Sequence, residues 1–175
     1  MATKPQELFA FLDKLGIAYR TIEHPPLFTV EQSQALRGKI AGGHTKNLFL
    51  KDKKGALFLL TALEDAAIEL KSLHRLLGAS GRFSFGSPEL LRATLGVEPG
   101  AVTPLALMND PAGRVSIALD AELMRYEIIN CHPLVNTMTL SMAAADLLRF
   151  LEVTGHRPRI QYLAQPPQTV AQHAP

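Results

Sequence analysis

The sequence lacks several features that would place it in a common class of protein. It has one cysteine, Cys131, which excludes an internal disulfide and a zinc site built from several cysteines. No stretch approaches the roughly 20 apolar residues that span a bilayer, and no apolar signal segment opens the chain. We therefore expect a cytoplasmic protein that has no membrane partner.

Charge and familiar catalytic motifs are also scarce. The formal net charge is +2 over 175 residues, which disfavours extended binding to duplex DNA but leaves a local nucleic-acid contact open. The P-loop, the dinucleotide-binding glycine pattern, the serine hydrolase motif and the zinc protease motif are all missing. The histidines are scattered, with no pair four residues apart on a helix, so we expect no metal site.

What the chain does contain is enough apolar material for a sizeable core. Apolar residues make up 47% of the sequence, and the length fits one domain. No repeat or change of composition divides residues 1–164, whereas Pro, Gln, Ala and His dominate residues 165–175. We expect a single domain over 1–164 followed by a disordered tail over 165–175.

Caps, apolar periodicity and turn residues predict interspersed helices and strands. Capping boxes predict helices that begin at Thr3 and Thr29, and a cap followed by proline predicts another at Ser87. Helices are expected near 3–15, 29–36, 69–77, 87–95 and 143–154, and strands near 17–23, 46–51, 56–62, 82–85, 114–119, 127–131, 137–142 and 160–163. This order predicts an α+β (mixed α/β) domain in which helices pack on a mixed β-sheet.

The most informative stretch covers residues 42–50, where two glycines precede a lysine, an asparagine and an apolar run. The run alternates poorly, which predicts a strand buried on both faces. Lys46 is either a solvated strand end, the ordinary position of a lysine, or a cation held rigidly to meet an anionic ligand or a developing negative charge. Asn47 beside it adds an amide that can both donate and accept.

Two further sets of residues lie where predicted strands end, a common place for sites. Gly100 lies in a predicted loop over residues 96–104 whose backbone N–H groups can meet an oxyanion or a carboxyl oxygen. His132 either belongs to a site or is a hydrogen-bonded core histidine, and the residues leave both alternatives open. Cys131 precedes it, and because neighbours on a strand point to opposite faces, we expect Cys131 to pack in the core and not to form a Cys-His dyad.

Together these motifs resemble the YbaK and prolyl-tRNA synthetase insertion-domain family of editing deacylases, and within it the free-standing ProX proteins. The matching motifs are residues 45–52, a GxxxP segment at residues 100–104, residues 130–133 with 136–137, and the last helix with 154–156. The resemblance covers roughly residues 5–163. It implies a mixed, partly barrel-like β-sheet surrounded by helices.

The resemblance also implies an activity. It implies an aminoacyl-tRNA deacylase that needs no cofactor and hydrolyses the ester between a mischarged amino acid and the 3′ adenosine of tRNA. For the ProX type the implied substrate is alanine on proline tRNA, with the tRNA acceptor end and prolyl-tRNA synthetase as partners. A deacylase for cysteine or another small amino acid, and a non-catalytic nucleic-acid-binding module, are the alternatives.

Roles for individual residues follow from the resemblance alone. Lys46 would contact the phosphate or ribose of the terminal adenosine, His132 would shape the pocket or position water, and Gly100 would belong to the segment that holds the aminoacyl group through backbone groups. The implied substrate-binding residues are Thr29, Thr45, Asn47, Ala101, Val102, Thr103, Pro104 and Pro133. No residue is an obvious general base, which fits a mechanism in which a ribose hydroxyl of the substrate helps to activate water.

Overall fold

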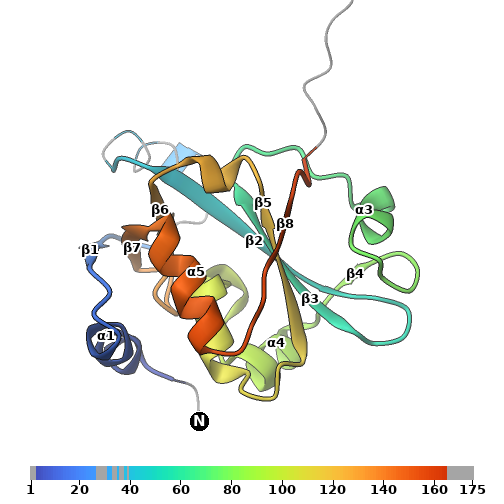
Figure 1. The fold of residues 1–175 in the computed structure, drawn as a ribbon, viewed down its shortest axis with the longest axis horizontal. Helices are drawn as coiled ribbons and strands as arrows, with labels where there is room; N and C mark the ends of the chain where they lie inside the picture. Colours follow the sequence, from blue (N-terminus) through green and yellow to red (C-terminus); the bar gives the residue numbers. More distant parts are fainter. Residues whose placement is uncertain (1–2, 27–30, 33–34, 36–37, 39, 165–175) are drawn as a thin grey trace, which may run out of the picture.

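A computed structural model of the protein describes residues 3–26, 31–32, 35, 38 and 40–164. They form a mixed β-sheet with helices packed around it (Figure 1). The strands are β1 (Tyr19–Glu23), β2 (Gly43–Lys51), β3 (Leu57–Leu63), β4 (Ser84–Phe85), β5 (Val115–Asp120), β6 (Ile128–Cys131), β7 (Met138–Ala143) and β8 (Arg159–Gln161). The helices are α1 (Pro5–Lys14), α3 (Leu70–Leu76), α4 (Pro88–Leu95) and α5 (Ala144–Val153). The predicted mixed sheet with surrounding helices is confirmed.

Strand β2 holds the sheet together because it belongs to two groups of strands. The strand order is β1-β7-β6-β2-β3-β5-β8, and β4 also pairs with β2. Along one edge β2 pairs with β3 over its whole length after His44. Along the other edge it pairs in parallel with β6 only at Gly43 and His44, and with β4 only at Leu50 and Lys51. Between these pairings the sheet is interrupted beside residues 46–48.

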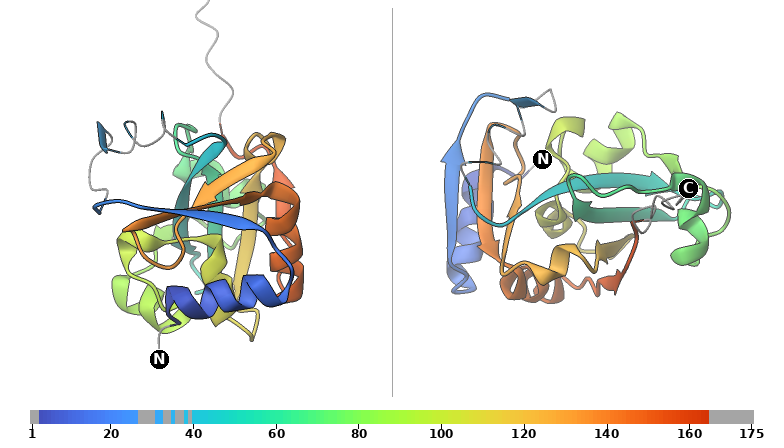
Figure 2. Two further views of the ribbon diagram at one scale, coloured as in Figure 1. Left: turned by 90° about the vertical axis from the view of Figure 1, so that its left-hand side faces the viewer. Right: turned by 90° about the horizontal axis from the view of Figure 1, so that it is seen from above.

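Two hydrophobic clusters lie on opposite faces of β2 and β3. The larger takes side chains from α1, α4 and α5 and includes Phe49, while the smaller takes side chains from α3 and includes Leu50. Helices α1 and α3 accordingly lie at opposite ends of the molecule (Figure 2). Phe49 and Leu50 are 4% and 0% exposed, so burial on both faces is confirmed there. The first half of the strand, which carries Lys46 and Asn47, is only half-buried.

The predicted hairpin and the predicted cap of α4 are both confirmed. Strands β2 and β3 pair antiparallel, and the Asp52 carboxylate closes their turn by accepting the backbone N–H groups of Lys54 and Ala56 at 2.9 Å each. The Ser87 hydroxyl caps α4 by accepting the N–H of Leu90 at 3.1 Å. Local sequence patterns were sufficient to predict this turn and this cap because each contact joins residues close in sequence.

Two local predictions are wrong. Helix α1 begins after Lys4 and not Thr3, whose hydroxyl instead donates to Asn109 on a distant segment. Residues 96–104, which the sequence predicts to be a loop, contain the 3-10 turn η1 (Pro99–Ala101). A second 3-10 turn, η2 (Pro104–Asn109), begins at the last of these residues. Proline at the first position of each turn suits helical geometry, which explains the difference.

Some predictions fall on residues that the structure does not describe. Most of the expected helix at 29–36 and all of the expected tail at 165–175 lie outside the described residues, and the predicted domain limits stay a prediction. Within the described part of the chain, no helix is long and apolar enough to cross a membrane.

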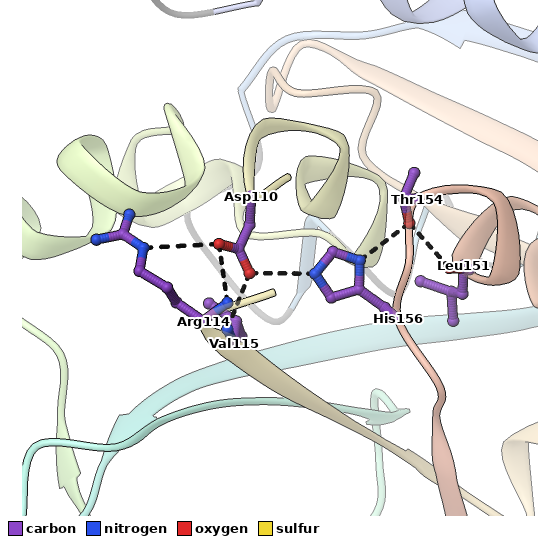
Figure 3. A network of polar contacts seen from close by, with 6 residues as sticks. All are labelled: Asp110, Arg114, Val115, Leu151, Thr154 and His156. Carbon is purple, nitrogen blue, oxygen red and sulfur yellow. Dashed lines mark hydrogen bonds and ion pairs between the residues drawn. The ribbon is translucent and has the colours of Figure 1, made fainter. Parts of the chain in front are cut away.

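A buried polar network joins the start of β5 to the residues after α5 (Figure 3). His156 Nε2 lies 3.1 Å from Asp110 Oδ2, and His156 Nδ1 lies 3.1 Å from the Thr154 hydroxyl. The Asp110 carboxylate also accepts the backbone N–H groups of Arg114 at 3.1 Å and Val115 at 2.9 Å. Burial by itself raises the pKa of Asp110, but these hydrogen bonds outweigh burial and hold the pKa below its ordinary value.

Replacing Asp110 with asparagine should destabilise the protein. An amide nitrogen cannot accept a hydrogen bond, so one buried donor loses its partner, and we expect the free energy of unfolding at pH 7 to fall by about 1–3 kcal/mol. Urea denaturation measures this loss. The exposed Asp65→Asn is the matched control and should change stability by no more than about 0.5 kcal/mol.

The free energy of unfolding that Asp110→Asn loses should depend on pH. Because the pKa of Asp110 is lower in the folded state, its stabilisation is complete above the ordinary aspartate pKa of about 3.9 and is lost as the pH falls below it. The gap between wild type and Asp110→Asn should therefore narrow on acidification. A gap that stays constant down to pH values well below about 3.9 would contradict this role.

Candidate active site between β2 and β6

The point where β2 leaves β6 is held by Asn130 and a glycine. Asn130 Nδ2 donates to the carbonyl of Ala41 at 3.0 Å, and its Oδ1 accepts the hydroxyl of Ser141 on β7. Gly42 has a φ of +109°, and a Cβ there would lie 2.7 Å from the carbonyl oxygen of Ile128. The chain can therefore enter β2 along this path only with glycine at position 42.

Beyond this point the side chains of β2 alternate between two environments. The Thr45 hydroxyl donates to the carbonyl of Asn130 at 2.8 Å and links β2 to β6. The Thr61 hydroxyl donates to Asn47 Oδ1 at 2.6 Å, which orients the Asn47 amide. The Lys46 ammonium points to the opposite face and donates to the carbonyl of Ala66. Lys46 is thus half-buried and held in place, with two further N–H groups available to a ligand.

A cavity of about 280 Å³ lies beside residues 47–49 of β2, at the edge that β6 and β4 leave open. Its wall includes Asn47 and Phe49 of β2, Phe85 of β4, Pro88 at the start of α4, Pro99 of η1 and Val102 of the GxxxP segment. We call it the Asn47 cavity. None of the described residues in its wall carries a charge. The structure therefore places Asn47 and Val102 of the GxxxP segment in the wall of one cavity and leaves the Lys46 ammonium outside that wall, and the predicted site stays a prediction.

Within the GxxxP segment, backbone and side chains face different surroundings. Ala101, Thr103 and Pro104 are buried in the protein, so their side chains are not exposed to a ligand. Val102 is half-buried and lines the Asn47 cavity. Gly100 is exposed, and a Cβ there would lie 3.0 Å from Asn136 Nδ2. Contact between a substrate and most of this segment would have to involve backbone atoms, as the resemblance implied.

His132 is half-buried beyond the end of β6. Its Nδ1 lies 3.2 Å from the carbonyl of Met138, so Nδ1 carries the proton and donates, and Nε2 is the acceptor of the neutral ring. Burial lowers the pKa of His132, and the hydrogen bond to Met138 raises it in part. His24 lowers the pKa further, and the charge of Glu64 raises it. The net shift is downward, which keeps His132 neutral at pH 7.

A second cavity of about 370 Å³ adjoins this histidine. Its wall contains Glu23, His24, Thr137 and Met138. It shares Met138 with the hydrogen bond that orients His132. Pro133, the other implied residue of this motif, is buried.

Cys131 is a core residue and not a nucleophile. It is 4% exposed, and burial raises the pKa of its thiol to about 12, against a weak opposing hydrogen bond with Thr103. The expected packing of Cys131 in the core is confirmed. The result follows from strand alternation, because Cys131 and His132 point to opposite faces.

Three parts of this region escaped the sequence analysis. Thr61, which orients Asn47, is a lone hydroxyl residue in an apolar strand, and that contrast could have identified it. The carbonyl of Ala66 and the ring of His24 offer no such local signal, because both reach the region from distant parts of the chain. Thr29 lies outside the described residues, so its implied role stays a prediction.

The fold and the interrupted sheet agree with one class of protein. The sequence profile of the aminoacyl-tRNA editing domain matches residues 24–150 of this chain. The chain therefore belongs to the aminoacyl-tRNA editing domain family, and the family resemblance stated from its motifs is confirmed.

Two relatives and one solved structure are similar to this chain over most of its length. The prolyl-tRNA synthetase associated domain-containing protein 1 of Danio rerio is 44% identical over 157 residues, which cover 89% of this chain and 85% of the relative. The prolyl-tRNA editing protein ProX of Acetoanaerobium sticklandii is 33% identical over 152 residues, which cover 86% of this chain and 92% of the relative. A crystal structure of a candidate trans-editing enzyme for prolyl tRNA synthetase shares the fold, with a TM-score of 0.71 and 21% identity over 95% of this chain and all of that one.

Proposed function

We propose that the protein is a trans-editing deacylase that hydrolyses alanyl-tRNA carrying a proline anticodon. The observation that carries the proposal is the stretch of the β2 edge left open between β6 and β4, where Asn47 and Val102 line a cavity and Lys46 is held on the strand beside it. Membership of the editing family supports the reaction class. The similarity to a protein named as a prolyl-tRNA editing protein supports the choice of tRNA.

The proposed reaction is the hydrolysis of an activated ester. A water oxygen attacks the ester carbonyl, the ribose oxygen leaves and takes a proton, and the products are free alanine and tRNA with its terminal hydroxyl restored. Such an ester needs little acid catalysis, so positioning and stabilisation of the oxyanion can supply most of the rate. A hydroxyl of the substrate ribose would help to activate water.

Each part of the region has a role in this scheme. The two remaining N–H groups of Lys46 would bind the phosphate or ribose of the terminal adenosine. Backbone groups of the GxxxP segment, with Gly100 exposed at its start, would hold the aminoacyl group. The neutral Nε2 of His132 would accept a hydrogen bond from water or from the amino acid.

Discrimination between alanine and proline would depend on the size of the amino acid side chain. A hydrophobic pocket separates two ligands that differ by one methylene by only about 1–3 kcal/mol, so editing sites act by excluding the larger amino acid. Exclusion of the proline ring would depend on the apolar side chains around the bound aminoacyl group and not on the total volume of the Asn47 cavity, which is about 280 Å³. Aminoacylated tRNA is made in the cytoplasm, which is the compartment that this function implies, with prolyl-tRNA synthetase as the enzyme whose errors are corrected.

The proposal predicts selective loss of alanine from mischarged proline tRNA. The purified protein should deacylate Ala-tRNA(Pro) and spare Pro-tRNA(Pro), which release of labelled amino acid measures. Cys-tRNA(Pro) in the same panel separates alanine editing from the editing of another small amino acid. Equal loss of alanine and proline, or loss of neither, would contradict the proposal, and binding without hydrolysis would favour a non-catalytic RNA-binding module.

Lys46→Ala should reduce single-turnover deacylation by about 10²-fold or more, the scale seen when one preorganised donor is removed. Lys46→Arg should restore little, because a planar guanidinium does not replace a compact ammonium bonded to Ala66. Thermal melts confirm that the variants fold. Lys71→Ala, an exposed lysine on α3, is the matched control and should retain full activity. Full activity in a folded Lys46→Ala protein would refute the role of Lys46.

The pH dependence of the deacylation rate should reflect the protonation of His132. Because burial lowers its pKa, the ring is neutral at pH 7, and enzymatic deacylation should fall only as the pH drops below the ordinary histidine value of about 6.5. The pH–rate profile between about 5 and 7.5, corrected for spontaneous hydrolysis, measures this inflection. His132→Ala should be slower and should lack the inflection. An inflection that persists in His132→Ala would assign it to another group.

A further inference from the structure

Phe85 is an exposed aromatic residue in the wall of the Asn47 cavity. It is 60% exposed, although its neighbour at position 83 packs its ring against Phe58 with 5.0 Å between the ring centroids. Among the aromatic ring pairs of the described residues, none includes Phe85. Core packing therefore does not explain why this position carries a large apolar ring.

The backbone around Phe85 is held firmly against β2. Phe85 pairs with Leu50 across the short β4 ladder, and the N–H of Gly86 donates to the carbonyl of Phe49 at 2.9 Å. A Cβ on Gly86 would lie 2.4 Å from the Phe49 ring, so the chain can approach this closely only with glycine at position 86. Phe85 is thus an exposed ring on a fixed support.

The cavity whose wall includes Phe85 suits an uncharged planar group. Its volume of about 280 Å³ is larger than the methyl side chain of alanine requires, so room remains for part of a nucleoside. Pro88 and Pro99 add flat apolar surfaces, and Asn47 supplies an amide that can meet the polar edge of a base. Unstacked bases at the ends of RNA bind in this way, by stacking on aromatic rings and by hydrogen bonds to their edges.

The surface next to Phe85 is basic. Residues 51–55 and 80–90 together carry four cations and two acids. Lys51, Lys53, Lys54 and Arg82 are all exposed, whereas one of the acids, Asp52, is buried and accepts backbone N–H groups. A stacking ring beside a basic surface is the combination that proteins use to bind single-stranded nucleic acid.

We propose that Phe85 stacks on the base of the 3′-terminal nucleotide of the tRNA acceptor end, with the preceding phosphates near Lys51 and Arg82. This inference rests on the proposed function, because that nucleotide carries the ester to be hydrolysed. The ring contacts a part of the substrate that does not change during the reaction. It therefore contributes equally to the ground state and the transition state, and its loss should raise KM while kcat stays nearly constant.

The test uses an uncharged acceptor-stem RNA minihelix that ends in 2-aminopurine in place of the terminal adenine, so its readout does not require catalysis. Binding to the wild-type protein should quench the 2-aminopurine fluorescence. Phe85→Leu keeps an apolar side chain without the ring, and it should abolish most of the quenching and weaken binding about 10-fold. Phe85→Tyr should retain both. Tyr162→Leu removes another exposed aromatic, 64% exposed beyond β8, and should change neither.

Kinetics with Ala-tRNA(Pro) then separate the two proposals. A KM raised about 10-fold in Phe85→Leu with an unchanged kcat supports the stacking role. Undiminished quenching and an unchanged KM in Phe85→Leu, in a protein that deacylates normally, would overturn this inference alone. Phe85-dependent quenching in a protein that does not deacylate would retain the stacking role and overturn the proposed function.

Discussion

The backbone hydrogen bonds of β2 are the constraint on which the rest of the structure depends. One edge of this strand is occupied by β3, while the other is divided between β6 at its beginning and β4 at its end. Gly42 and Gly86 permit the two close approaches, the first beside Ile128 and the second beside Phe49. Because β6 and β4 leave a stretch of this edge between them, the interruption beside residues 46–48 follows from how the strand is shared.

The alternation of a strand explains why adjacent residues of the candidate site lie in different surroundings. Asn47 shares a face with Phe49 and meets Thr61 and the cavity, whereas Lys46 lies on the face of Leu50 and reaches Ala66 near the smaller cluster. The same rule separates Cys131, in the core, from His132. A nucleophile would need a partner on its own face, while positioning groups can approach a substrate from several sides. The proposed chemistry, in which the protein mainly positions the ester and water, is compatible with this arrangement.

The balance between burial and hydrogen bonding sets the protonation of His132 and Asp110. His132 is neutral because it is partly withdrawn from water, and its tautomer is determined by the carbonyl of Met138. Asp110 is also withdrawn from water, yet its pKa is lowered because backbone N–H groups and His156 meet its carboxylate. For Asp110 the hydrogen bonds outweigh burial, whereas for His132 burial outweighs the hydrogen bond to Met138.

The sequence by itself determined the features that depend on neighbours along the chain. The β2–β3 turn at Asp52, the Ser87 cap and the burial of Cys131 each follow from residues within a few positions of one another or from strand alternation. The family motifs, which are short runs of sequence, likewise singled out Lys46 and the GxxxP segment. Only the tertiary structure decided what those residues touch. Thr3 contacts Asn109 instead of capping α1, Lys46 donates to Ala66, and Phe85 lies exposed beside the Asn47 cavity. These contacts join segments whose relative position depends on packing the whole sheet, and local propensities hold no information about distant partners.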